Sequence, residues 1–206
     1  MTRVKICGIT REEDAVLAAA LGAAALGFVF WDGSPRAVSP ERARAIVRSV
    51  PPLVSAVGVF VNQPWEEIAA IAAAVQLDAI QLHGDEPVAE CERYPRRVIK
   101  AVPVSQLAHA SRWPEHVTLL VDGTDADRRG GTGRSVDWGA VAPVARQRRI
   151  ILAGGLNPGN VGDAIAAVGP FAIDLSSGVE SAPGIKDGTR LRALFASIRR
   201  AEGAGV

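Results

Sequence analysis

The chain has 206 residues, of which 48% are hydrophobic, and its 23 basic and 22 acidic side chains leave a formal net charge of +1. That length and composition suit one domain with a complete hydrophobic core. The balanced charge argues against a nucleic-acid partner, which usually requires a basic excess, and no apolar run reaches the roughly 18 residues of a membrane span.

Short apolar segments alternate along the chain with alanine-rich segments of helical pattern. The predicted strands are Val4–Cys7, Leu26–Phe30, Ser55–Phe60, Ala79–Leu82, Val98–Val102, Thr118–Val121, Ile150–Ala153 and Phe171–Asp174. The predicted helices are Glu12–Leu21, Pro40–Val50, Pro64–Val75, Pro87–Cys91, Ser105–Arg112, Trp138–Ala145, Asn160–Ala167 and Asp187–Ala201. Thr10 and Ser39 are expected to cap the first two helices, with Pro40 at the first position of the second.

Eight strand–helix units predict a parallel α/β sheet that closes into a single (β/α)8 TIM barrel over residues 1–206. An open doubly wound sheet is the alternative, but no GxGxxG turn follows the first strand. In a barrel, the chemistry gathers where the strands end. The predicted strand ends carry polar side chains that do not suit a core: Cys7, Asp32, Asn62, His83, Lys100, Asp122 and Asp174.

The first strand places Lys5 and Cys7 two residues apart, so both side chains lie on one face of it. Only Lys5, Lys100 and Lys186 of the basic residues are lysines, so a retained lysine is expected to mark a rigidly placed ammonium. The two cysteines, Cys7 and Cys91, have no metal-ligand spacing and form no disulfide framework. We therefore expect no metal, and a cytoplasmic protein without nucleic-acid or membrane partners.

Glycine-rich turns follow the last two strands, in ILAGGLNPGN at 151–160 and DLSSGVE at 174–180. Backbone amides in such turns and at helix starts bind anions, and these two loops form the usual phosphate site of this barrel. We expect a small phosphorylated substrate. A third run, GGTGR at 130–134, is either a plain surface loop or a mobile lid that excludes water.

The chain resembles the phosphoribosylanthranilate isomerases of tryptophan biosynthesis along its whole length. The motifs that carry the resemblance are VKICGIT, GFVF with SPRAVS, VGVFVN, QLHGDE, VIKAV, GGTGRSVDW, ILAGGLNPGNV and SSGVESAPGIKD. The resemblance implies a cofactor-free barrel that carries out an Amadori rearrangement of N-(5-phosphoribosyl)anthranilate. Residues 123–129 match no pattern of that family.

The family's residue roles carry over to matching positions here. They imply Cys7 as the catalytic base, Asp122 as the catalytic acid and Arg36 as the partner of the substrate's carboxylate. They imply phosphate binding by Gly154, Gly155, Ser177 and Gly178, and place His83 and Asp174 in the substrate pocket. The acid must be partly protonated near neutral pH, which burial or a nearby negative charge would favour. Lys5 is expected to pair with Asp174 and to favour the thiolate of Cys7.

Several alternatives remain open. The chain could be the sister sugar-phosphate isomerase of histidine biosynthesis or a dual-substrate version of it, although that chemistry typically uses two carboxylates. It could be a flavin-binding barrel, or a non-catalytic barrel that keeps only the phosphate site. The oligomeric state is expected to be a monomer or a homodimer.

Overall fold

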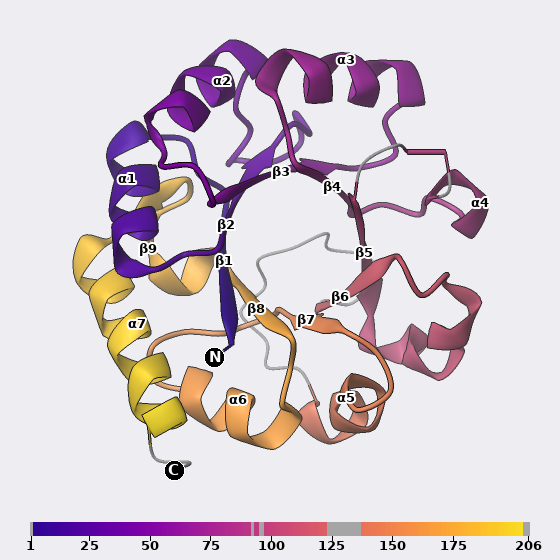
Figure 1. The fold of residues 1–206 in the computed structure, drawn as a ribbon, viewed down its shortest axis with the longest axis vertical. Helices are drawn as coiled ribbons and strands as arrows, with labels where there is room; N and C mark the ends of the chain where they lie inside the picture. The colour runs from indigo at the N-terminus through magenta and orange to yellow at the C-terminus, as the bar shows by residue number, and fades with distance from the viewer. Residues whose placement is uncertain (1, 92, 95–96, 123–136, 204–206) are drawn as a thin grey trace.

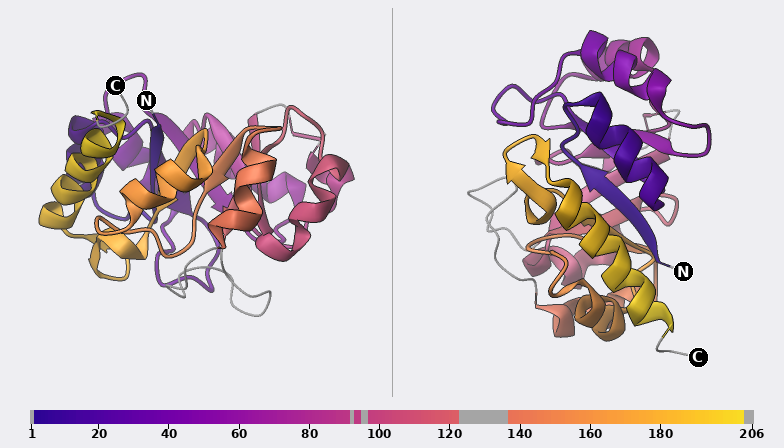
Figure 2. Two further views of the ribbon diagram at one scale, coloured as in Figure 1. Left: turned by 90° about the horizontal axis from the view of Figure 1, so that it is seen from below. Right: turned by 90° about the vertical axis from the view of Figure 1, so that its left-hand side faces the viewer.

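The computed structural model describes residues 2–91, 93–94, 97–122 and 137–203. Eight parallel strands pair in chain order and close into a barrel, with helices around its outside (Figure 1). The predicted (β/α)8 TIM barrel is thereby confirmed. Figure 2 shows both termini at one end of the barrel and a small hairpin after the eighth strand at the other end.

Every end of the barrel strands lies within one residue of its predicted position. They are β1 (Arg3–Cys7), β2 (Ala25–Val29), β3 (Ser55–Phe60), β4 (Ala79–Leu82), β5 (Arg97–Pro103), β6 (Thr118–Asp122), β7 (Ile150–Leu152) and β8 (Ala172–Leu175). The α-helices are α1 (Glu12–Leu21), α2 (Pro40–Ser49), α3 (Trp65–Val75), α4 (Val88–Cys91), α5 (Trp138–Ala145), α6 (Val161–Val168) and α7 (Gly188–Gly203). None of the helices in these ranges has the length and apolar character to cross a membrane.

Three local features differ from the prediction. The segment after β5 is a 3-10 helix, η1 (Val104–Arg112), rather than an α-helix. Thr10 does not cap α1: Arg11 holds the N-cap position, and the Thr10 hydroxyl donates to the carbonyl of Gly184 instead. After β8, a short 3-10 turn, η2 (Ser177–Val179), leads into an unpredicted hairpin of β9 (Glu180–Ala182) and β10 (Ile185–Lys186).

The cap of α2 is confirmed, because the Ser39 side chain accepts a hydrogen bond from the amide of Arg42 and Pro40 begins the helix. Proline is tolerated there because its missing amide would have no intrahelical acceptor. This cap fixes where the long β2–α2 loop ends. Since Arg36 lies in that loop, the cap also limits where its side chain can reach.

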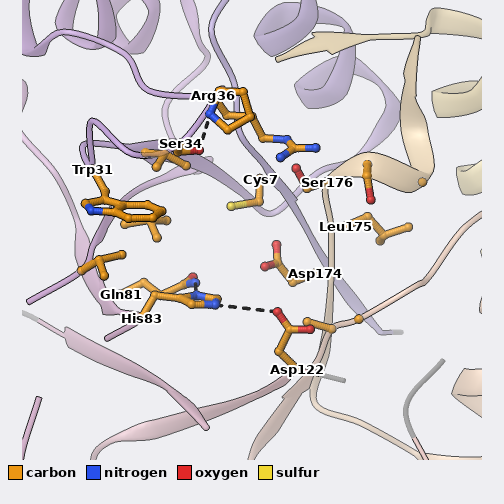
Figure 3. A pocket seen from close by; sticks show the side chains of 18 of the residues that line it. Cys7, Trp31, Ser34, Arg36, Gln81, His83, Asp122, Asp174, Leu175 and Ser176 are labelled. Carbon is orange, nitrogen blue, oxygen red and sulfur yellow. Dashed lines mark hydrogen bonds and ion pairs between the residues drawn. The ribbon is translucent and has the colours of Figure 1, made fainter. Parts of the chain in front are cut away.

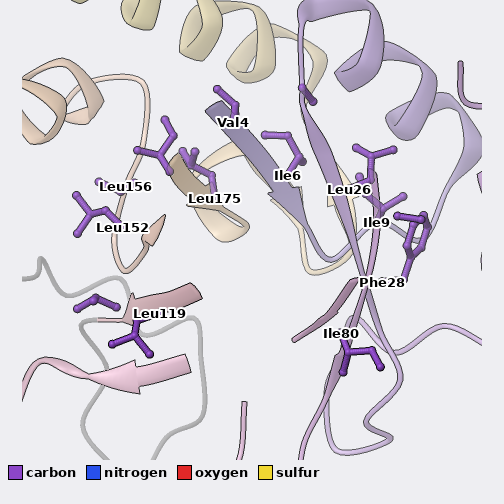
Figure 4. Close-up of a cluster of buried hydrophobic side chains, with 14 of the residues drawn as sticks. Val4, Ile6, Ile9, Leu26, Phe28, Ile80, Leu119, Leu152, Leu156 and Leu175 are labelled. Carbon is purple, nitrogen blue, oxygen red and sulfur yellow. The ribbon is translucent and has the colours of Figure 1, made fainter. Parts of the chain in front are cut away.

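The hydrophobic core has two parts, which follow from the alternation of side chains along each strand. Every second residue points into the barrel, where small and β-branched side chains such as Val57, Ala101 and Ala153 fill the narrow interior. The others, such as Leu26 and Leu119, point outward and belong to the cluster between the strands and the helices. Figure 4 shows part of this cluster. The inward positions at the carboxyl ends of the strands are therefore the ones that face the site.

Candidate active site

A cavity of about 690 Å³ opens at the carboxyl ends of the barrel strands. Every residue to which the family resemblance gave a role lines it: Cys7, Arg36, His83, Asp122, Gly154, Gly155, Asp174, Ser177 and Gly178. Figure 3 shows how the labelled side chains surround it. Their positions follow from barrel closure, which brings the ends of all eight strands to one rim.

Cys7 is the last residue of β1, and its side chain points into the cavity above Lys5. Lys5 is buried and its Nζ lies 2.9 Å from Oδ1 of Asp174, so the predicted ion pair is confirmed. A Cβ on Gly27 of β2 would lie 2.8 Å from the sulfur of Cys7 and 3.0 Å from Nζ of Lys5. Glycine at this position therefore makes room for both side chains.

Opposing effects act on the pKa of the Cys7 thiol. Burial raises the pKa of the Cys7 thiol, and the negative charge of Asp174 adds to that effect. The ammonium groups of Lys5 and Lys186 act in the opposite direction, and the pKa remains above that of an ordinary thiol. Lys5 thus favours the thiolate as predicted, but desolvation outweighs it because a charged group loses more than a neutral one on leaving water.

Asp122, the last residue of β6, faces the cavity beside His83. Oδ2 of Asp122 lies 3.7 Å from Nε2 of His83, and Nδ1 of that ring lies 2.9 Å from Nε2 of Gln81. With the amide nitrogen of Gln81 placed toward the ring, Nδ1 accepts and a neutral ring carries its proton on Nε2. Gln81 thereby directs an N–H of His83 toward Asp122.

Gln81 was missed at the sequence level, because it lies within a segment that otherwise has the pattern of an apolar strand. It is only 1% exposed and shares an inward face with His83 two residues later. The period of two that placed Cys7 beside Lys5 would have found it.

Arg36 lies in the β2–α2 loop and lines the cavity, but its side chain already has a partner. Its Nε and Nη2 form a two-pronged contact with the carboxylate of Glu180, the shortest distance being 2.7 Å from Nη2 to Oε2. The hydrogen bonds with Glu180 raise the pKa of Arg36 further, so it is a permanent cation. Glu180 was not predicted as part of the site, although the motif that contains it was.

The two glycine-rich turns meet at the cavity. Gly154 and Gly155 follow β7, and Ser177 and Gly178 lie in η2 after β8. A Cβ on Gly178 would lie 1.9 Å from the carbonyl oxygen of Leu156, so only glycine allows the turns to approach this closely. Their backbones together form one edge of the pocket.

All three lysines of the chain are buried and paired with a carboxylate, as the scarcity of lysine suggested. Besides Lys5, Lys100 lies 2.8 Å from Glu86 and Lys186 lies 2.7 Å from Glu180. Lys100 was expected on the rim, and that prediction is wrong. Its neighbours Ile99 and Ala101 point into the barrel, so Lys100 points outward and its Nζ donates to the carbonyl of Gly84.

Two stretches of the sequence named above have no described structure. The GGTGR run at 130–134 and residues 123–129 lie outside the described part of the chain.

Within the described ranges, no group of three or more His, Cys, Asp or Glu side chains is arranged to hold a metal ion. Apolar groups complete the cavity wall, with Trp31, Val29 and Val59 among them.

Comparison with known proteins finds relatives that are similar along nearly the whole chain. Residues 4–197 match the family model described as N-(5'-phosphoribosyl)anthranilate isomerase. An isomerase of that name from Geotalea uraniireducens is 47% identical over 205 residues, which cover 98% of this chain and all of the relative. A solved phosphoribosylanthranilate isomerase from Thermotoga maritima aligns with a TM-score of 0.90 at 44% identity, covering 98% of this chain and all of that one. A further structure contains reduced 1-(o-carboxyphenylamino)-1-deoxyribulose 5-phosphate, and aligns with a TM-score of 0.87 at 42% identity over 98% of this chain and all of that one.

Proposed function

Because the chain belongs to the N-(5'-phosphoribosyl)anthranilate isomerase family, we propose that Cys7 is the general base and Asp122 the general acid of its reaction. The chain converts N-(5'-phosphoribosyl)anthranilate into 1-(2-carboxyphenylamino)-1-deoxyribulose 5-phosphate, an aldose–ketose isomerisation of tryptophan biosynthesis. The observation that supports the assignment best is that the thiol and the carboxylate face one cavity from β1 and β6. From separate strands, they can act on different atoms of one substrate.

The two ends of the substrate suit two sides of the pocket. The phosphate binds to the turns that contain Gly155 and Gly178, whose backbone amides and adjacent helix start favour an anion. The anthranilate carboxylate binds to Arg36, whose planar cation matches a carboxylate. Trp31 and the neighbouring apolar wall suit the aromatic ring. A relative's structure that holds a reduced product analogue supports a phosphorylated ligand in this pocket.

Ring opening comes first in the proposed mechanism. Asp122 gives its proton to the furanose ring oxygen while the bond from that oxygen to C1 breaks. The lone pair of the anthranilate nitrogen forms a double bond to C1, which leaves a protonated Schiff base. His83, oriented by Gln81, then donates an N–H toward the carboxylate that Asp122 has become.

Proton abstraction follows. The thiolate of Cys7 takes the proton from C2, a double bond forms between C1 and C2, and the nitrogen regains its lone pair. The resulting enolamine becomes the ketone when C1 gains a proton and the C2 hydroxyl loses one. The enzyme returns to its starting state once one proton has passed from Cys7 to Asp122. The substrate's own nitrogen accepts the electrons, so this chemistry does not require a cofactor.

Anthranilate-type fluorescence provides the test. N-(5'-phosphoribosyl)anthranilate, generated in situ and mixed with the purified protein, should lose its fluorescence at a rate proportional to protein concentration. An unchanged signal with folded protein would refute the activity. The same experiment with the aldose of the histidine pathway tests the dual-substrate alternative. The oligomeric state, monomer or homodimer, stays a prediction.

A further inference from the structure

The guanidinium of Arg36 has two edges that can hold a carboxylate, and the protein occupies one of them. Glu180 takes the edge formed by Nε and Nη2, at 3.0 and 2.7 Å. Within the described part of the chain, no acceptor contacts Nη1. Only the edge formed by Nη1 and the second hydrogen of Nη2 is therefore left for a ligand. The side chain of Arg36 is 17% exposed and that of Glu180 only 4%.

Glu180 has a second cationic partner that lies behind the pocket wall. Nζ of Lys186 lies 2.7 Å from Oε1 of Glu180, and its side chain is completely buried. The amide of Gly184, at 3.3 Å, and the hydroxyl of Ser176, at 3.4 Å, also donate to the same oxygen. The carboxylate of Glu180 is therefore held by the fold independently of any substrate.

The charge balance of this cluster decides whether it can attract an anion. Arg36 paired with Glu180 alone would be neutral overall. Burial lowers the pKa of Lys186, and the carboxylate of Glu180 acts against that shift. With its ammonium charged, Lys186 leaves one net positive charge shared among the three side chains. Because the cluster is largely buried, that charge is weakly screened by water. Neither Glu180 nor Lys186 lines the cavity, so neither is placed to touch the ligand itself.

The same lysine links the cluster to the base. Nζ of Lys186 also donates to the carbonyl oxygen of Cys7, at the end of β1. Glu180 is two residues beyond Gly178, so the turn proposed to bind the phosphate continues directly into the hairpin that holds Arg36. Residues 177–186 therefore serve three parts of the proposed site. They include the proposed phosphate turn, they hold Arg36 through Glu180, and they contact the backbone of Cys7 through Lys186.

We propose that Glu180 and Lys186 are positioning residues that confer selectivity for a substrate with an ortho carboxylate on its aromatic amine. Glu180 fixes the guanidinium so that its free edge faces the pocket, and Lys186 keeps the cluster positively charged. This inference depends on the proposed role of Arg36 as the carboxylate partner.

The experiment compares two ligands on the full-length chain. One is the reduced product analogue, and the other is its phenylamino counterpart without the carboxylate, which keeps the phosphate. The ratio of their dissociation constants, measured by calorimetry, reports carboxylate selectivity. We expect Lys186→Met and Glu180→Asp each to lower this ratio roughly tenfold or more, the scale of a lost charged hydrogen bond. The affinity for the ligand without the carboxylate should stay unchanged.

The double variant Glu180→Gln/Lys186→Met separates charge from geometry, because it restores one net positive charge without the clamp. Its selectivity should exceed that of Lys186→Met, and a ratio no higher would overturn the role of charge. Glu180→Asp keeps every charge, so it serves if Lys186→Met fails to fold. Lys100→Met is the matched control, since it also breaks a buried lysine–glutamate pair but far from Arg36; it should keep the wild-type ratio.

Arg36→Met tests the role of Arg36 as the carboxylate partner separately from the positioning role of Glu180 and Lys186. If it abolishes selectivity while Lys186→Met and Glu180→Asp both keep the wild-type ratio, the positioning role is wrong and the proposed function stands. If Arg36→Met itself keeps the ratio, the carboxylate binds elsewhere and both proposals for this cluster fail.

Discussion

Lys5 and Asp174 form a buried ion pair of 2.9 Å between adjacent strands, one layer below the thiol of Cys7. Residues 5 and 174 are paired in the register of β1 and β8, so this contact forms where the first and last strands close the barrel. The pair joins the first and last strands of the sheet. It also places beside the proposed base a cation that lowers the pKa of Cys7 and an anion that raises it.

The first prediction concerns the pH dependence of turnover in Lys5→Met. Lys5 lowers the pKa of Cys7, so its removal should raise that pKa further. The thiolate is the reactive form, hence the acidic limb of kcat/KM should move to higher pH. Activity near neutral pH should fall about tenfold for each pH unit of that movement. Lys5→Met/Asp174→Asn should lie between wild type and Lys5→Met, because Asp174 raises the same pKa. An unmoved limb would leave Lys5 a purely structural role.

The second prediction concerns the base itself. Cys7→Ser replaces a group of reference pKa ~8.5 by a hydroxyl that hardly ionises, so kcat should fall by roughly 10²–10⁴-fold with little change in KM. Iodoacetamide should inactivate the wild type, and the reduced product analogue should protect it. Cys91 offers an internal control, because it is buried, whereas Cys7 is partly exposed and lines the cavity. Peptide mapping should find the label on Cys7 alone; near-wild-type turnover in folded Cys7→Ser would overturn the mechanism.

The third prediction concerns the acid. Asp122→Asn keeps the shape of the side chain but has no acidic proton for the ring oxygen, so kcat should fall by about 10²–10⁴-fold. A substrate analogue whose ring is already open should be much less affected, because that step is then bypassed. Equal losses on both substrates would reduce Asp122 to a positioning residue.

The fourth prediction concerns the tautomer of His83. Gln81→Glu replaces the amide donor by an acceptor, so the proton of the neutral His83 ring should move to Nδ1. Nε2, which faces Asp122, should then carry no proton. Nitrogen-15 NMR of labelled histidine should show this exchange, and kcat should fall by roughly tenfold, the scale of one hydrogen bond to a charged group. Gln81→Met should give a mixture of both tautomers. A wild-type histidine spectrum in Gln81→Glu would show that another group sets the tautomer.

The fifth prediction concerns the phosphate edge. A methyl group on Gly178 would collide with the carbonyl of Leu156, so Gly178→Ala should push the two turns apart. KM should rise roughly tenfold or more, as charged hydrogen bonds are lost. Gly162→Ala in α6 is the matched control, because its methyl would meet Ala201 at an ordinary 3.5 Å. Equal KM values in the two variants would place phosphate binding elsewhere.

The sequence by itself determined the architecture, because the evidence for it is local. Alternation along Val4–Cys7 and the Ser39–Pro40 helix start each depend on a few adjacent residues, and eight such units in order leave few other folds. Rim residues such as Cys7 and Asp122 followed from the same logic, since a strand's end is visible in its own segment. The Lys5–Asp174 pair could also be predicted from the sequence, because a closed barrel makes its first and eighth strands neighbours.

Only the tertiary structure decided how the charges of the site are balanced. Arg36 and Glu180 are 144 positions apart, and they meet through a loop and a hairpin that no periodic pattern predicts. The thiol pKa depends on how deeply Cys7 is surrounded, a property of packing in three dimensions. A sequence specifies which groups are present near each strand end, but desolvation and pairing depend on distances that exist only after the barrel has closed.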